Sequence, residues 1–480
     1  MIARRRFALI AALIGLNGCS MAPVYHVPTV SVSSDAWKNT PWQHAEPSDA
    51  LPHNAWWNIY FDPALNQLET KIDNANPDLA AALARYNQAL AYIGQLDSKS
   101  LPSLDASSAA TRNRQSDDRP LRSANQPSDY KNNTFGINTN YELDVWGRIR
   151  DQVVAGKAAA EASAADLEFV RLSLHAALAD NYVQIRGIDD EARLLSDTVN
   201  AYTRALTLTQ NRHTGGIASG IDVARAQTQL STAKAQLAEV AARRAIYEHA
   251  IASLMGEPAM SFTLPPQVET LKIPHIPIGI PSTLLQRRPD IAAAERRTAQ
   301  TNALIGSARA AFFPSFSLTA QGGYQNTSGL ANLLAAPNSF WTLGPGVVLN
   351  LFDAGLHQAQ LDQARFALDE AGAKYRSTVL TAFQQVQDCL SQLIHYQQEA
   401  IEQADAVTAA NKTTSLALNR YREGAINYLE VVTAQTAALE AQRSVLNLHT
   451  RQLQTSINLI RALGGGWSND HLSMESPKDR

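Results

Sequence analysis

Apolar and polar residues alternate at every second position in three stretches of the chain. In the clearest, residues 134–145, mainly apolar side chains occupy the odd-numbered positions, and small or polar ones occupy the even-numbered positions. This period of two is typical of a β-strand with one apolar and one polar side. Together with a weaker fourth run, the pattern predicts strands at about 103–112, 134–145, 314–324 and 340–352.

Strands of this kind fit two environments. In an outer-membrane barrel the apolar side faces lipid and the polar side faces a lumen. A half-buried sheet of a soluble protein alternates identically. Trp146, Trp341 and Phe352, near the strand ends, would suit an aromatic girdle at a membrane interface, and core packing explains them nearly as well.

A long helical segment follows each strand pair. The first covers about 148–211 and resumes to about 254, and the second covers about 356–421 and resumes to about 463. Apolar residues of the first step by threes, fours and sevens, which is the seam of helices packed as coiled coils. A helix of about sixty residues extends about 90 Å, far beyond a compact domain, so these helices are expected to project.

The chain contains one structural unit twice. Residues 76–82 recur as 288–294 at an offset of 212, and shared residues of 211–227 return in 419–435 at an offset of 208. The offset changes between these blocks, where the hairpin loops differ in length. Each half is therefore predicted to contain a helix, two strands and a long helix pair.

Four strands per chain are too few to close a barrel. The smallest familiar closed barrels have about eight strands. Lipid tolerates no open sheet edge, because unpaired backbone groups cannot be satisfied there. If the strands enter a membrane, several copies must therefore pair their sheet edges. The open edges therefore predict an oligomer, and they do not fix the number of copies.

The first residues have the order of a secretory signal. Arg4–Arg6 precede an apolar run, Phe7–Leu16, which is too short to span a bilayer. Leu16-Asn17-Gly18-Cys19 resembles a bacterial lipobox, in which cleavage precedes the cysteine and its thiol and new amine are acylated, although Asn17 departs from the usual small or apolar residue. The alternative is an ordinary signal peptide with an incidental cysteine. Ser20 resembles the residue type that sorts lipoproteins to the outer membrane.

Composition and motifs exclude several classes of function. The net charge of −3, with 18% charged residues, leaves no basic surface for nucleic acid. The chain has no His-Glu-x-x-His, no phosphate-binding loop and no Gly-x-Ser-x-Gly elbow, so we expect no enzyme, no metal site and no cofactor. Cys389 is the only cysteine besides Cys19, and we expect it to be a small core residue without a disulfide partner.

Short motifs in a fixed order resemble a known family. They are Trp56-Trp57 with Phe61-Asp62 and Leu65, Asp144-Val145-Trp146-Gly147, Asn419-Arg420-Tyr421 with Gly424, Tyr428-Leu429-Glu430-Val431 with Ala434-Gln435, and Leu463-Gly464-Gly465-Gly466-Trp467. Together with the duplication, this order resembles the outer membrane factors of Gram-negative bacteria. These are TolC-like proteins, and the resemblance is to the lipoprotein branch of tripartite multidrug efflux systems.

The resemblance implies a mainly α chain with a β-barrel part. Three copies would form a 12-stranded outer-membrane barrel continuous with a periplasmic α-helical barrel. The duct would be passive, for drugs or other small molecules, with a periplasmic adaptor and an inner-membrane pump of the resistance-nodulation-division type as partners. The expected divisions are a signal peptide 1–18, a lipidated segment 19–75 near the equator of the helical barrel, a first repeat 76–256, a connector 257–287, a second repeat 288–467 and a tail 468–480.

The resemblance also identifies candidate residues at the two helix-to-helix turns. In the family these turns close the periplasmic tip, where acidic side chains ring the pore. The expected acids are Asp222 and Glu430; the family's second acidic position is Thr433 here. An acid in the first turn of a helix is also favoured by the helix dipole alone. The candidate latch partners are Arg212, Arg420, Tyr421 and Arg422, and the candidate adaptor-docking residues are Gly215, Gly216 and Gly424.

Three other functions remain open at this point. One is a duct of the same architecture for type I protein secretion. Another is a coiled-coil structural lipoprotein without a pore, and the third is an exported enzyme.

Overall fold

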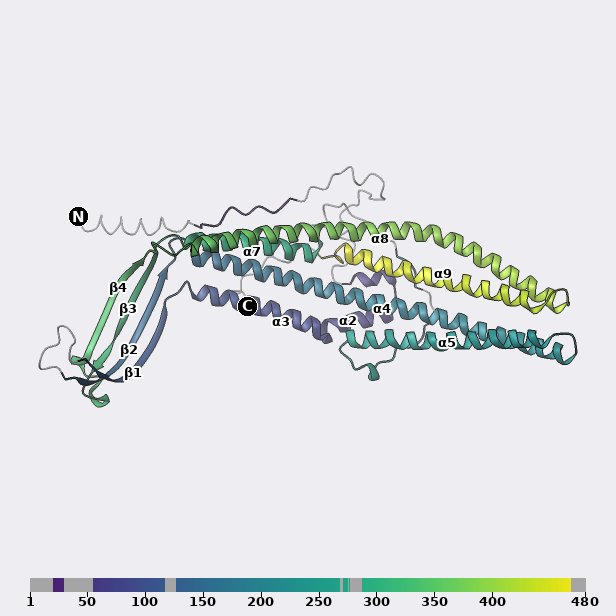
Figure 1. Cartoon of the computed structure of the whole chain (residues 1–480), viewed down its shortest axis with the longest axis horizontal. Coiled ribbons are helices and arrows are strands. Elements are labelled where there is room, and N and C mark those ends of the chain that lie inside the picture. Colours follow the sequence, from purple (N-terminus) through teal and green to yellow (C-terminus); the bar gives the residue numbers. More distant parts are fainter. Residues whose placement is uncertain are drawn as a thin grey trace. The chain divides into compact units, whose positions relative to one another are not determined.

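The computed structural model describes residues 20–29, 55–116, 127–267, 271–274, 276 and 287–467. The order of helix, two strands and long helix pair occurs twice, as the sequence predicts (Figure 1). The first unit consists of α3 (Pro77–Ser98), β1 (Ser103–Arg114), β2 (Asp129–Leu143), α4 (Arg148–Thr214) and α5 (Gly220–Leu254). The second consists of α7 (Pro289–Ala310), β3 (Ser315–Asn326), β4 (Ser339–Val348), α8 (Leu356–Arg422) and α9 (Tyr428–Ala462).

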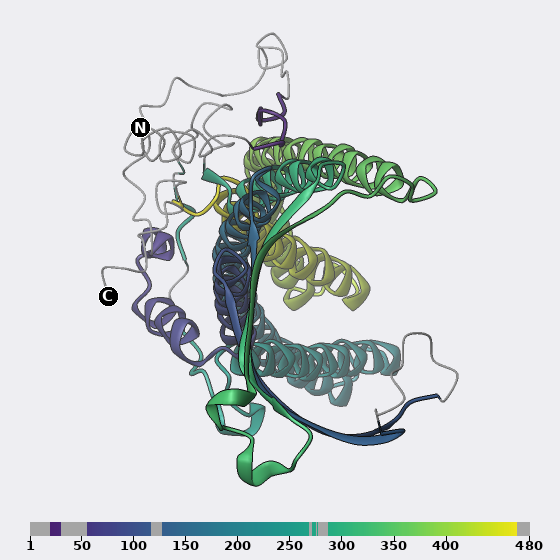
Figure 2. The ribbon, with the colours of Figure 1, turned by 90° about the vertical axis from the view of Figure 1, so that its left-hand side faces the viewer.

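The four strands form one antiparallel sheet in the order β1-β2-β3-β4. Figure 2 shows the strands bending together into an arc. Both outer strands, β1 and β4, have a neighbour on one side only among the described residues. The sheet of a single chain is therefore open at two edges.

The register places most of the large apolar residues on one side of the sheet; Phe340 and Val348 lie on the other. Ile137 pairs with Gly322, Gly322 pairs with Trp341, and Ala320 pairs with Leu343. On the other side Asn138 pairs with Asp105 and with Gln321. The apolar side is uncovered, because Trp341 is 80% and Leu343 62% exposed. A soluble half-buried sheet would instead cover this side with other elements.

Two strand limits differ from the sequence prediction. β2 begins at Asp129 rather than at about 134, because the polar residues 129–133 pair with the end of β1. β4 ends at Val348 rather than at about 352, since its pairing with β3 stops at Ser315. The alternation of Leu349 and Leu351 thus continues beyond the last paired residue. Short 3-10 helices, Leu330–Asn332 and Ala336–Asn338, lie in the β3–β4 connection.

The described chain divides into two compact units that cut across the sequence repeats. One contains the sheet with the adjoining ends of the helices, from Arg85–Ala164 and Ala293–Arg376, together with the N-terminal segment up to Thr29. The other contains Val30–Ala84, Ala165–Ala292 and Ser377–Arg480. No described helix combines the length and apolar composition that a membrane span requires.

The core of the second unit includes two elements that the sequence analysis does not predict. These are the 3-10 helix η2 (Trp56–Tyr60) and α2 (Pro63–Ala75), which contribute Trp57, Leu65 and Ile72. Asp62 caps α2 by accepting from the backbone N–H groups of the first turn, and Pro63 occupies its first position. Cys389 is buried in the same core, and burial raises the pKa of its thiol to about 11. The prediction of a small core residue at this position is confirmed.

Candidate functional site

The two helix-to-helix turns end each long helix in the same way. α4 turns into α5 after Gly216 (φ +76°), and α8 turns into α9 after Gly424 (φ +81°). In each turn a backbone N–H bonds back to the helix, from Ile217 to Arg212 at 2.8 Å and from Ala425 to Arg420 at 2.9 Å. These bonds and the left-handed glycine form a helix C-cap. The equivalence of the two turns agrees with the sequence repeat.

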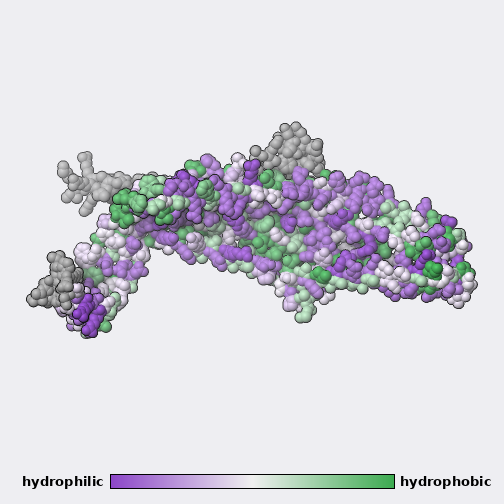
Figure 3. All heavy atoms as spheres, in the orientation of Figure 1, coloured by the Kyte–Doolittle hydropathy of each residue, from purple (hydrophilic) through white to green (hydrophobic). Residues whose placement is uncertain are grey.

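The turns present open surface. A Cβ added to Gly216 would meet no atom within 4 Å, whereas one added to Gly424 would meet only Arg212 Nη2, at 3.8 Å. Ile217 and Ile221 beside the first turn are 70% and 64% exposed. Figure 3 shows hydrophobic surface among polar residues at this hairpin end of the helices. Gly215 has an ordinary negative φ, so only Gly216 and Gly424 are required as glycine by backbone conformation.

Three of the predicted latch residues lie together. The guanidinium carbon of Arg212 lies 4.8 Å from the ring centroid of Tyr421, which is a cation–π contact. Arg212 Nη1 also donates to the carbonyl of Arg422 at 2.9 Å. Arg212 therefore joins the end of α4 to the end of α8. Arg420 is exposed, and the described residues give it no recorded side-chain partner.

A tyrosine cluster lies directly behind this contact, and no pattern along the sequence predicts it. Tyr421 and Tyr428 meet edge to face with centroids 5.2 Å apart, and both pack with Tyr202 of α4. The pKa of Tyr428 is raised to about 12, mainly by burial, with contributions from the nearby Tyr421, Tyr202 and Asp222 side chains. Asp222 thus lies close to the cluster. The cluster fills the space between the helices just inside the turns.

Asp222 has a local structural role. Its carboxylate accepts from the backbone N–H of Ser219 at 3.4 Å, and the Ser219 hydroxyl accepts from the backbone N–H of Asp222 at 3.3 Å. This capping box satisfies two donors at the start of α5. An ion pair with Arg225 at 3.8 Å adds to it.

Glu430 is placed differently, although it occupies the matching position in α9. It is exposed, and no hydrogen bond or ion pair of its side chain is recorded among the described residues. Asn427, the N-cap residue of α9, makes no side-chain capping bond. Thr433, three residues later, donates to the carbonyl of Leu429 at 3.0 Å. The geometry of the single chain leaves the pore-lining roles of Asp222 and Glu430 as predictions.

The proposed aromatic girdle residues divide into two groups. Trp146 donates from its indole nitrogen to the carbonyl of Pro314 at 2.8 Å and stacks on Phe313, so it packs the strand–helix junction. Trp341 and Phe352 are 80% and 87% exposed. Only these two present large aromatic surface away from the protein, as an interfacial belt requires.

A second cluster unites α2 with α4. His175 Nδ1 lies 2.7 Å from Glu69 Oε2, and both side chains are almost wholly buried. His175 Nε2 lies 3.4 Å from Asp73, and the Trp57 indole stacks on the imidazole at 4.5 Å. Burial raises the pKa of Glu69 to about 7, although the hydrogen bond and charge of His175 oppose the shift.

This shift predicts a pH-dependent stability. The folded state holds the Glu69 proton between pH 4.5 and about 7, where the unfolded chain releases it, so the free energy of unfolding falls as pH rises through this window. Across this window the free energy of unfolding should fall by up to about 3 kcal/mol.

The variant Glu69→Gln tests this assignment, because it keeps an acceptor for His175 and removes the titrating carboxyl group. Its melting temperature should therefore decline less than that of the wild type from about pH 5 to 8. An equal decline in both proteins would contradict this assignment, and Glu399→Gln, at an exposed ion pair, is the matched control.

Comparison with known proteins assigns the chain to one group. Residues 70–257 and 280–465 match the outer membrane efflux protein family. The toluene efflux pump outer membrane protein TtgC of Pseudomonas putida is 30% identical over 473 residues, which cover 96% of this chain and 97% of that one. The pyoverdine export outer membrane protein OpmQ of Pseudomonas aeruginosa is 30% identical over 482 residues, covering 97% and 98%.

Solved structures give the same result. The outer-membrane channel OprN superposes with a TM-score of 0.85 at 29% identity and covers 94% of this chain and 100% of its own. The CmeC outer membrane channel of Campylobacter jejuni has a TM-score of 0.87 at 25% identity and covers 95% and 96%. These relatives are named as channels and efflux proteins, not as enzymes. The described residues contain no group of three side chains arranged to hold a metal ion.

Proposed function

Because the chain belongs to the outer membrane efflux protein family, we propose that three copies join their sheets into one twelve-stranded barrel. The chain is an outer-membrane channel component of a tripartite efflux system in a Gram-negative bacterium. In the proposed assembly, a periplasmic adaptor links it to an inner-membrane pump of the resistance-nodulation-division type, which supplies the energy. The duct itself is passive.

The two open edges of the four-stranded sheet are the main support for the proposed barrel. Edge strands expose unpaired backbone N–H and C=O groups, which lipid does not satisfy. Pairing β4 of one copy with β1 of the next removes every edge when the ring closes. The uncovered apolar side then faces lipid, and the polar side, with Asn138 and Gln321, faces the lumen.

The N-terminal segment supports the proposal of a lipid anchor. Cys19 lies outside the described residues, but Ser20 donates to Asp151 at 2.6 Å near the start of α4. Further contacts hold the segment beside α7, where Tyr25 donates to Glu295 at 2.6 Å and Asn302 donates to Pro23 at 2.8 Å. Acyl chains on Cys19 would thus start close to the strand–helix junction. We propose that both the barrel and these lipids hold the chain in the outer membrane.

The exposed turns support the proposed adaptor contact. Gly216 and Gly424 lie on open surface beside the apolar Ile217, Ile221 and Leu429, which are exposed in the single chain. The names of the two relatives mention toluene and pyoverdine, both small molecules. We therefore propose that this chain also passes small molecules rather than unfolded proteins.

Gene deletion tests the transport proposal. We expect deletion to increase accumulation of a fluorescent dye and to increase sensitivity to a panel of drugs, and wild-type expression to restore both. Unchanged accumulation without the gene would remove the transport proposal for these substrates.

Cys19→Ser tests the lipid anchor. This variant should lose incorporation of labelled palmitate and still restore efflux, because the barrel remains in the membrane. Absence of label in the wild type would show that Cys19 is not acylated.

A further inference from the structure

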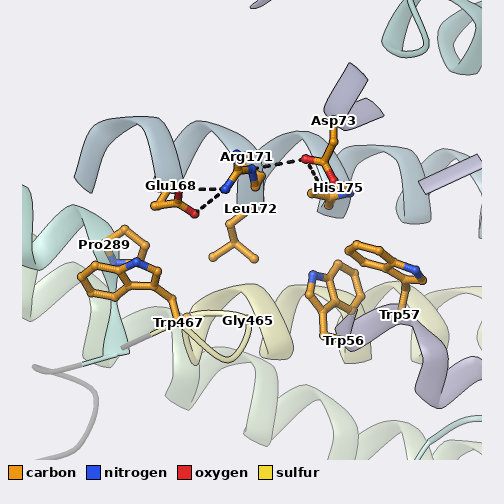
Figure 4. A pocket seen from close by; sticks show the side chains of 11 residues that line it. Trp56, Trp57, Asp73, Glu168, Arg171, Leu172, His175, Pro289, Gly465 and Trp467 are labelled. Carbon is orange, nitrogen blue, oxygen red and sulfur yellow. Dashed lines mark hydrogen bonds and ion pairs between the residues drawn. The ribbon is translucent and has the colours of Figure 1, made fainter. Parts of the chain in front are cut away.

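A cavity of about 210 Å³ lies in the second compact unit, and none of its lining residues belongs to the helix-to-helix turns. Figure 4 shows Trp467 and Trp56 on opposite sides of Leu172, with Glu168 and Arg171 above them. Residues of η2, α2, α4, the first position of α7 and the turn after α9 line the cavity. Its volume is below that of pockets for drug-sized ligands, which suits a smaller organic molecule of roughly ten heavy atoms.

The apolar walls of the cavity are indoles. Trp56 and Trp467 are 2% and 9% exposed, so the protein around them holds their rings in place. Trp57 lines the cavity as well and is fixed by stacking on His175. Tryptophan is the aromatic side chain that attracts a cation most strongly through its ring face.

The charged wall carries a net negative charge. Arg171 Nη1 donates to both oxygens of Glu168, at 2.8 and 3.0 Å, and its Nε lies 3.2 Å from Asp73 Oδ1. One guanidinium is thus shared by two carboxylates, which leaves one negative charge. The adjacent Glu69–His175 pair adds no net charge, whether the shared proton lies on the carboxyl or on the imidazole.

The backbone after α9 fixes the Trp467 side of the cavity. Gly464 and Gly465 have φ values of +93° and +60°. A Cβ at Gly465 would lie 2.3 Å from Leu172 Cδ1, and one at Gly464 would collide with the carbonyl of Arg287. Both glycines are therefore needed to bring Trp467 to its place. A site held in this way loses little entropy when a ligand enters.

We propose that this cavity binds an organic monocation with an apolar body, of the arylammonium or quaternary ammonium class. The apolar body lies between Trp56 and Trp467, and the cationic group lies where the indole faces meet the carboxylates of Asp73 and Glu168. The bound cation lies beside the two carboxylates that share Arg171, and its charge balances the excess negative charge of this wall. This site goes beyond the proposed duct function, because none of its lining residues belongs to the sheet or to the helix-to-helix turns.

Calorimetric titration of the purified full-length chain in a non-ionic detergent tests the proposal. The probe is benzyltrimethylammonium, and benzyl alcohol and benzoate are the neutral and anionic comparisons. We expect saturable binding of one cation per chain, about fivefold or more tighter than either comparison. Equal binding of the three probes, or no saturation by about 10 mM, would overturn the proposal.

Variants locate the binding. Asp73→Asn makes the wall neutral and should weaken cation binding about fivefold, whereas Trp467→Leu should weaken it more and Trp467→Phe less. Phe366→Leu, at an exposed position of α8, is the matched control. Each variant is first compared with the wild type in oligomeric mass and melting temperature. If Asp73→Asn and Trp467→Leu retain the fold and bind the cation as the control does, the cavity is not the site.

Discussion

Leu343→Arg is expected to prevent stable assembly of the chain in the outer membrane. Leu343 lies in the middle of β4 on the uncovered apolar side, where it is 62% exposed in the single chain. An arginine facing lipid near the middle of a bilayer costs about 2–4 kcal/mol per copy. Three copies in one barrel multiply this cost, so the amount of folded oligomer in the outer membrane should fall steeply.

Thr342→Arg is the matched control. Thr342 is the preceding residue, is also exposed, and lies on the polar side, where it pairs with Gln321. Because this side faces water in the proposed barrel, the variant should assemble normally and change only the conductance. Membrane fractionation with heat-modified gel migration measures both outcomes. Similar assembly of the two variants would contradict a lipid-facing role for the apolar side, since both positions are exposed in a lone sheet.

Glu430→Gln is expected to reduce the cation preference of the channel several-fold in a planar bilayer. Its carboxylate is exposed and has no recorded partner among the described residues, so in a ring of three copies it would act on passing ions. Removing like charges from a narrow mouth should also favour the closed tip, because their repulsion is lost. The measurements are single-channel conductance and reversal potential in a salt gradient.

Asp222→Asn should behave differently. Asn keeps an oxygen that can accept from the Ser219 backbone N–H, so the main losses are the ion pair with Arg225 and the favourable charge at the start of α5, together about 0.3–1 kcal/mol. We expect lower thermal stability of the tip and a smaller change in ion preference. The double variant, Asp222→Ala with Glu430→Ala, should combine both effects. Unchanged conductance and ion preference in the double variant would reject the gate assignment for both residues.

The sequence predicts those parts of the fold that depend on local patterns. Alternation located the strands, and the repeat of 76–82 in 288–294 located the duplicated unit. The ends of β2 and β4 could not be located in this way, because they depend on which residues the neighbouring strand offers for pairing. α2 was missed, although Asp62 followed by Pro63 is a local signal for a helix start.

The sites differ in how far their contacts extend along the chain. The Ser219–Asp222 capping box spans three residues and is visible as a motif. The contact of Arg212 with Tyr421 and the Glu69–His175 pair, which is separated by 106 residues, arise only when distant helices pack. Nothing in the spacing of these residues along the chain indicates their pairing. The latch role of Arg212, Arg420, Tyr421 and Arg422 therefore stays a prediction, and Tyr202, which packs with Tyr421, is absent from the predicted set.

The mass of the purified mature chain in a mild detergent, measured by native mass spectrometry, tests the central claim most directly. We expect a closed trimer that dissociates on heating and that needs detergent to stay in solution. A stable monomer that remains dissolved without detergent would contradict it, because a four-stranded sheet with two open edges would then be complete by itself.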